Sequence, residues 1–187
     1  VFAGLGWMMT RKLWTEELSS KWPKGYWDEW LRDPEQRKGR HVLRPEISRT
    51  FHFGVKGGAS ANQFGDRLTQ VFLNPDPVQW NREDLSHLQL DQFDREYWSM
   101  LRSARRVENV EDAVERAKEG DVRLEYTSFK QFQSLATKLS LMADEKAGIP
   151  RTAYKGVVET RPFGDHLLLL TPPLKDLQKS FQSAITR

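Results

Sequence analysis

The chain has 187 residues, and its 29 basic and 26 acidic side chains leave a formal net charge of +3, which is too small to demand a polyanionic partner. It contains no cysteine, which excludes disulfides, thiol catalysis and thiolate zinc sites. With 38% hydrophobic residues, the chain can form one or two small domains with a buried core.

Neither a metal site nor a membrane span is expected from the residue pattern. The four histidines are scattered without ligand spacing: His41, His52, His87 and His166. The longest apolar run covers residues 167–170, which is the length of a strand and far short of the roughly 20 residues that span a bilayer. No signal peptide is visible, and no Asp-x-Asp sequence occurs.

The first expected element is a helix capped by Thr10, with Leu13, Trp14 and Leu18 as its apolar stripe. A dense aromatic group then flanks the acidic pair at positions 28 and 29: Trp22, Tyr26, Trp27 and Trp30. Pro23 is compatible with a first helical turn here, and Trp27 and Trp30 would share a helix face. A carboxylate at Asp28, partly desolvated by indole rings, would be a better proton acceptor near neutral pH.

The next segment has the composition of a phosphate-binding loop. Residues 35–44 are rich in basic side chains, and residues 51–53 are expected to form a short strand. Residues 54–60 contain three glycines that let amide N–H groups turn inward, with a charge from Lys56 and a hydroxyl from Ser60. This combination suits a diphosphate, although the spacing is neither that of a P-loop nor that of a dinucleotide fingerprint.

A run with prolines at positions 75 and 77 breaks regular structure and marks the expected boundary between residues 1–74 and residues 75–187. Beyond it the pattern predicts helices over 82–105, 111–118, 128–139 and 174–185, a strand over 122–126 and a hairpin over 153–171. The all-apolar second strand of the hairpin should be buried on both faces. Arg151 and Lys155 could face an active site, but a solvated strand edge fits their pattern better.

Two plainer interpretations stand beside the catalytic one. Tryptophans at helical spacing usually pack a core, and an acidic pair beside them is usually a solvated edge. A sequence pI near 9.2 with 11% aromatic residues would also fit a non-enzymatic module that binds RNA. However, the aromatic residues lie mostly on helix stripes, and only residues 37–44 are dense in positive charge, so we expect no nucleic-acid partner.

The chain resembles the alpha-1,3-mannosyl-glycoprotein 2-beta-N-acetylglucosaminyltransferase family, in order along nearly its whole length. The resemblance is carried by residues 4–9 (GLGWMM), 21–40 (KWPKGYWDEWLRDPEQRKGR), 44–54 (RPEISRTFHFG), 73–88 (LNPDPVQWNREDLSHL) and 148–158 (GIPRTAYKGVV). Residues 22–54 are the most specific part. The related O-linked-mannose beta-1,2-N-acetylglucosaminyltransferases share the W-D and PEQR-x-GR patterns, so O-linked mannose remains an alternative acceptor.

The resemblance implies an α/β fold: the C-terminal part of a GT-A-type, inverting glycosyltransferase over residues 1–74, and a small α+β subdomain over residues 75–187. It implies UDP-GlcNAc as donor, a mannose-terminated N-glycan as acceptor, and a divalent metal, usually manganese. The catalytic base of the family falls on Asp28. Trp27 would shape the sugar pocket, and Arg40 would have a supporting or charge-balancing role.

The family's loop over the donor diphosphate aligns its serine with Ser60, and Ala59 stands where bulkier residues are common. This loop carries one extra residue here. The metal-binding acidic triplet and the uridine site of the family lie in an N-terminal half that nothing here matches, so we expect a C-terminal fragment that is inactive alone. The manganese ligands and a membrane anchor are then expected outside this chain, in a type II membrane protein of the Golgi lumen.

Overall fold

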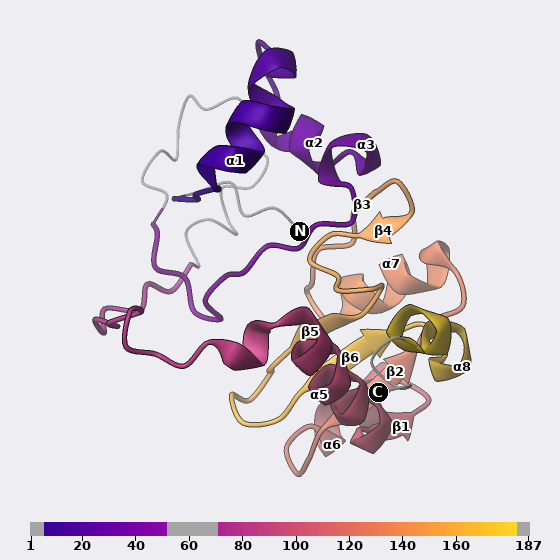
Figure 1. Ribbon diagram of the computed structural model, residues 1–187. Coiled ribbons are helices and arrows are strands. Elements are labelled where there is room, and N and C mark those ends of the chain that lie inside the picture. The colour runs from indigo at the N-terminus through magenta and orange to yellow at the C-terminus, as the bar shows by residue number, and fades with distance from the viewer. Residues whose placement is uncertain (1–5, 52–70, 183–187) are drawn as a thin grey trace. The chain divides into compact units, whose positions relative to one another are not determined.

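The computed structural model describes residues 6–51 and 71–182 (Figure 1). The chain divides into two compact units, Phe2–Glu83 and Asp84–Arg187, which we call the N-terminal and the C-terminal unit. The strand expected over residues 51–53 falls almost entirely outside the described residues. So does the expected phosphate loop, including Ala59 and Ser60.

The N-terminal unit begins with the predicted cap. The Thr10 hydroxyl oxygen accepts a hydrogen bond from the Leu13 N–H at 3.2 Å, which confirms Thr10 as the start of helix α1 (Arg11–Leu13). The helix continues as a wider π-helical turn, η1 (Trp14–Leu18), and a tight 3-10 turn, η2 (Ser19–Lys21). Leu18, on the predicted apolar stripe, is only 2% exposed.

Two short helices follow, α2 (Trp27–Arg32) and α3 (Pro34–Arg37). The expectation that Pro23 lies in the first turn of the Trp27 helix was wrong, because Tyr26 has a left-handed backbone (φ 51°) and the helix starts only after it. Pro34 instead opens α3, where its fixed φ and missing N–H suit a first helical position.

Five tryptophans pack together in this unit, and we call them the tryptophan cluster. The ring of Trp22 lies at its centre, with centroid distances of 6.5, 5.1, 6.1 and 5.5 Å to Trp7, Trp14, Trp27 and Trp30, respectively. Trp7 and Trp27 also contact each other at 5.4 Å. Aromatic rings at such distances stabilise one another beyond their burial, so the cluster holds the segments that carry them together.

An ion network joins η1 to the end of α3. The Glu17 carboxylate accepts hydrogen bonds from Lys38 Nζ at 2.7 Å and from the Arg40 guanidinium. Arg40 also donates to the Gln36 carbonyl oxygen at 2.9 Å. The hydrogen bond from Lys38, followed by that from Arg40, lowers the pKa of the Glu17 carboxyl to about 2.

The C-terminal unit is built on a four-stranded sheet in the order β1-β2-β6-β5. Its strands are β1 (Arg105–Val107), β2 (Val122–Glu125), β5 (Val158–Thr160) and β6 (Leu168–Thr171). The first three in sheet order are parallel, and β5 runs antiparallel to β6, which confirms the predicted hairpin. A separate two-stranded hairpin consists of β3 (Glu145–Lys146) and β4 (Ile149–Pro150).

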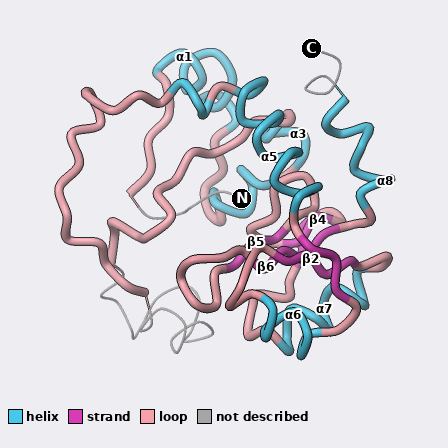
Figure 2. The backbone as a smooth tube through the Cα atoms, turned by 90° about the horizontal axis from the view of Figure 1, so that it is seen from below, coloured by secondary structure: helices cyan, strands magenta, loops and turns pink. Residues whose placement is uncertain are grey.

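Helices cover both faces of this sheet. Leu168 and Leu170 of β6 pack with α6 (Val110–Arg116) and α7 (Phe129–Lys138). Figure 2 shows β2, β5 and β6 of this sheet, with α6 and α7 nearby. Leu169 packs on the opposite face, in a cluster with residues of α5, α8 and η4. These last elements are α5 (Leu90–Ser103), α8 (Leu174–Leu177) and η4 (Gln178–Phe181). All four residues of β6 are buried, as the apolar run predicted.

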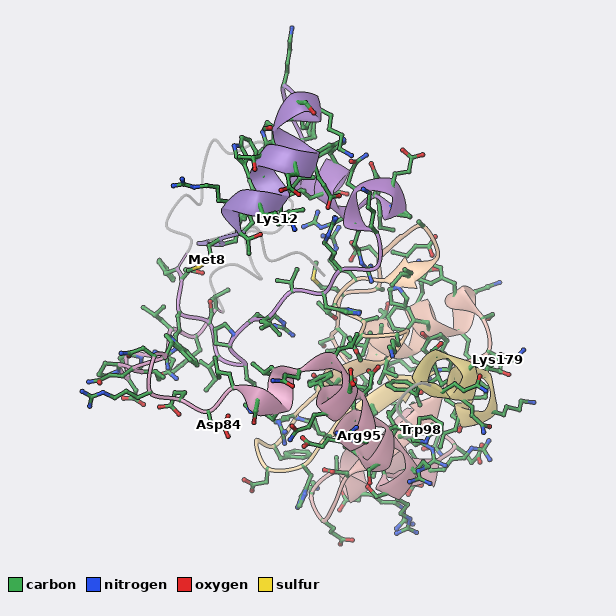
Figure 3. The ribbon with its side chains drawn as sticks, in the orientation of Figure 1. Met8, Lys12, Asp84, Arg95, Trp98 and Lys179 are labelled. Atoms are coloured by element: carbon green, nitrogen blue, oxygen red, sulfur yellow. The ribbon has the colours of Figure 1, made fainter. Side chains whose placement is uncertain are left out.

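Helix α5 shows how one side of a helix joins the core while the other faces water. Trp98 stacks on Phe181 of η4 with ring centroids 5.4 Å apart, and Arg95 on the same helix is exposed (Figure 3). Asp94 is only 2% exposed, and it accepts hydrogen bonds from the Tyr154 hydroxyl at 2.6 Å and from Lys155 Nζ at 2.7 Å. The expectation of a solvated edge was therefore wrong for Lys155, because its ammonium pairs with a buried carboxylate.

The predicted boundaries were wrong for the helices expected over 82–105 and 174–185. The helix expected over 82–105 is a 3-10 turn, η3 (Ser86–Leu88), followed by α5, because the extended backbone of Gln89 separates them. Ala104 is also extended, so residue 105 already belongs to β1. The last helix is α8 followed by the 3-10 turn η4. By contrast, Ser128 caps α7 as predicted, accepting from the Gln131 N–H at 3.2 Å.

Replacing Phe132, which is fully buried, with alanine should lower the free energy of unfolding of the C-terminal unit by about 3–5 kcal/mol, because the core loses apolar contacts and gains a cavity. Urea denaturation followed by far-UV circular dichroism measures this loss. Phe163→Ala is the matched control, since Phe163 is 47% exposed, and should cost at most about 1 kcal/mol. Equal losses in the two variants would contradict this core assignment.

Glu17→Gln should lower the melting temperature at neutral pH, because the amide cannot replace the ionised partner of Lys38 and Arg40. A carboxyl with a lowered folded-state pKa stabilises the fold above its ordinary value of 4.5, and that stabilisation is lost as the pH falls through about 2. The melting temperatures of the variant and the parent should therefore converge toward pH 2. Glu16→Gln, at the exposed neighbouring position, is the control. A difference that does not change with pH would contradict the role of charge.

Candidate active site

Asp28 lies in the first turn of α2, where the helix dipole favours a negative charge. One turn later, Arg32 donates to Asp28 Oδ2 at 3.4 Å and also to the Glu29 carboxylate. The Asp28 side chain is 40% exposed, whereas that of Arg32 is only 15% exposed. The mostly buried guanidinium thus orients a carboxylate that solvent, or a substrate, can still reach.

Trp27, the residue before Asp28, connects Asp28 to the tryptophan cluster. Trp27 is half-buried, and its ring lies 5.4 Å from that of Trp7 and 6.1 Å from that of Trp22. The indole of Trp27 is therefore held in place from two sides. Because Trp27 and Asp28 are neighbours on α2, the packing that fixes one also fixes the backbone of the other.

Hydrogen bonds to the Glu17 carboxylate and to the Gln36 carbonyl oxygen restrict the rotation of the Arg40 side chain. This side chain is 35% exposed, so part of the guanidinium faces solvent. The structure therefore describes three of the five predicted site residues: Asp28, Trp27 and Arg40. The other two, Ala59 and Ser60, lie outside the described residues.

Three residues that contact these site residues were not predicted from the sequence: Arg32, Trp7 and Glu17. Arg32 could have been found, because residues three and four apart on a helix face each other and position 32 has this spacing to both acids. Trp7 belongs to a segment whose contacts no local pattern reveals. Glu17 is 21 and 23 residues from its two cationic partners, and no sequence signal links them.

The chemistry available to this arrangement is proton transfer. An oriented carboxylate can accept a proton from an alcohol, and a flat indole beside it can pack against the apolar C–H face of a sugar. Across residues 6–51 and 71–182, no group of three or more histidine and acidic side chains could hold a metal ion. The described helices are also too short or too polar for any of them to cross a membrane.

Comparison with known proteins identifies the family of the chain. The model of the GNT-I family matches residues 1–181. Alpha-1,3-mannosyl-glycoprotein 2-beta-N-acetylglucosaminyltransferase of Arabidopsis thaliana is 41% identical over 162 residues, which is 86% of this chain and 36% of that protein. The chain thus spans about a third of the length of the curated relative that it matches. With a family match over almost its entire length, the chain belongs to the GNT-I family.

Proposed function

We propose that this chain is part of an inverting glycosyltransferase that moves GlcNAc from UDP-GlcNAc to a terminal mannose of an N-glycan, in β-1,2 linkage, in the Golgi lumen. Family membership and the name of the Arabidopsis relative support the reaction class. The observation that carries the proposal is the Asp28 carboxylate, oriented by Arg32 and attached to the tryptophan cluster through Trp27.

In this reaction Asp28 accepts the proton of the mannose 2-hydroxyl while that oxygen attacks the anomeric carbon of GlcNAc. The new C–O bond forms on the face opposite the diphosphate, the bond between the anomeric carbon and the UDP oxygen breaks, and UDP leaves with the electron pair. A single displacement inverts the anomeric centre. One base is therefore sufficient, and no covalent intermediate with the protein is required.

The remaining predicted site residues belong to the donor side of the proposal. Arg40 would balance negative charge near the diphosphate, and the Ser60 hydroxyl would donate a hydrogen bond to a phosphate oxygen, with Ala59 beside it. The described residues do not fit a manganese site. No step of the proposed transfer runs through a metal.

Asp28→Asn in the intact enzyme should reduce turnover by about 100-fold or more, because the amide keeps the shape of the side chain but cannot accept the proton. Donor affinity, measured by isothermal titration with UDP-GlcNAc, should stay close to that of the parent. Glu29→Gln is the matched comparison, since Glu29 is similarly exposed and also contacts Arg32, and it should retain most of the turnover. If Glu29→Gln is the inactive variant and Asp28→Asn is active, the base is misassigned.

The acceptor is tested separately, by offering the intact enzyme a mannose-terminated N-glycan and an O-mannosyl peptide. We expect transfer to the N-glycan, because the chain belongs to the GNT-I family and the Arabidopsis relative is named for an alpha-1,3-mannosyl-glycoprotein acceptor. Mass spectrometry of the two products measures the preference. Transfer to the O-mannosyl peptide alone would contradict the proposed acceptor while leaving the chemistry at Asp28 in place.

A further inference from the structure

A cavity of about 180 Å³ opens in the C-terminal unit, just beyond the carboxyl ends of β2 and β6. Three segments line it: the residues from the end of β2 into α7, the β3–β4 hairpin, and the residues from the end of β6 into α8. Nothing in the proposed transfer reaction uses this cavity.

The topology of the sheet creates this cavity. Strands β2 and β6 are parallel neighbours, but the helices that follow them pack on opposite faces. Helix α7 packs on the face that carries Leu168 and Leu170, and α8 packs on the face that carries Leu169. The two connections therefore leave the sheet in opposite directions, and in open α/β sheets ligands bind in the crevice that such connections leave at the carboxyl edge.

The walls of the cavity are fixed by contacts within the unit. The Tyr126 hydroxyl donates to the Gly156 carbonyl oxygen at 2.5 Å. Gly156 has a positive φ of 88°, and a Cβ there would approach Pro172 Cγ to 3.0 Å, so this turn packs closely against the wall. The Thr127 N–H donates to Gln131 Oε1 at 2.9 Å. A ligand would meet a site that is already formed, which reduces the ordering cost of binding.

The lining selects a class of ligand. The exposed carboxylate of Asp176 repels an anion. Asp176 is also the single acidic side chain in the lining, whereas a divalent cation needs a shell of several oxygen ligands. A purely apolar ligand would desolvate that carboxylate without supplying a partner for it, which is costly. Phe129, Pro150 and Pro173 nevertheless supply apolar surface. A small neutral ligand with hydroxyl groups and an apolar face fits this lining, because its hydroxyls can donate to Asp176 and its apolar face can pack against Phe129 and the prolines.

We propose that this cavity binds one neutral hexose unit of a glycan, with a sugar hydroxyl donating to Asp176 and the C–H face of the ring against Phe129 and the prolines. The cavity is smaller than the roughly 300–1,000 Å³ of drug-sized pockets, which fits a single sugar ring. The choice of mannose as that hexose rests on the proposed function, whereas the preference for a neutral sugar rests on the lining alone.

The test is a titration of the ¹⁵N-labelled 187-residue chain with methyl α-mannopyranoside, followed by amide chemical shifts. We expect saturable shifts at millimolar sugar for amides of residues 127–130 and 174–176. Asp176→Ala should weaken this binding about tenfold, the equivalent of about 1.4 kcal/mol. Asp165→Ala, which removes another exposed acid of the same unit, should leave it unchanged. Thr127→Trp, which fills the cavity from an exposed position, should abolish the shifts.

Absence of saturable shifts at these amides would overturn the proposal, as would shifts that survive both Asp176→Ala and Thr127→Trp. Stronger shifts at the same amides with inorganic phosphate would show an anion site instead. Sugar-dependent shifts confined to the N-terminal unit would also overturn it. Because the readout is sugar binding and not GlcNAc transfer, the cavity proposal can fail while the transferase proposal stands, and the reverse also holds.

Discussion

The packing of Trp22 against four other indole rings is the constraint on which the N-terminal unit depends. Within residues 6–51 and 71–83, Leu18 is the one fully buried apolar side chain, so these rings replace an ordinary aliphatic core. The cluster joins residue 7 to the π-helical turn η1 and to helix α2 by contacts between rings. Since Trp27 belongs to the cluster and Asp28 follows it, the position of the proposed base is a consequence of aromatic packing.

The C-terminal unit is stabilised instead by a sheet with an apolar core on each face. Strand β6 is apolar on both faces, so it needs helices on both sides, and these helices must leave the sheet in opposite directions. The cavity at its carboxyl edge is a geometric result of that arrangement. In both units, therefore, the packing that stabilises the fold also builds the surface on which a sugar would be bound.

The features that sequence predicted are those that depend on neighbouring residues. Thr10 and Ser128 cap helices through hydrogen bonds three residues away, and the strand at residues 168–171 follows from an unbroken apolar run. Helix boundaries near residue 89 could not be predicted, because apolar residues continue at helical spacing through a point where the backbone is extended. By contrast, the proximity of Asp28 to Trp27 could be predicted because the two residues are neighbours in the sequence. The hydrogen bond from Arg40 to Glu17 could not, because the fold brings together residues that are 23 positions apart.

A crystal structure of the intact enzyme with UDP and a mannoside acceptor would show whether Asp28 is placed to take the proton from the mannose 2-hydroxyl. We expect a carboxylate oxygen of Asp28 within hydrogen-bonding distance of the mannose 2-oxygen, about 2.6–3.2 Å, with the diphosphate of UDP on the far side of that oxygen. A bound mannoside whose 2-oxygen contacts another acidic side chain, with Asp28 facing solvent, would contradict this placement.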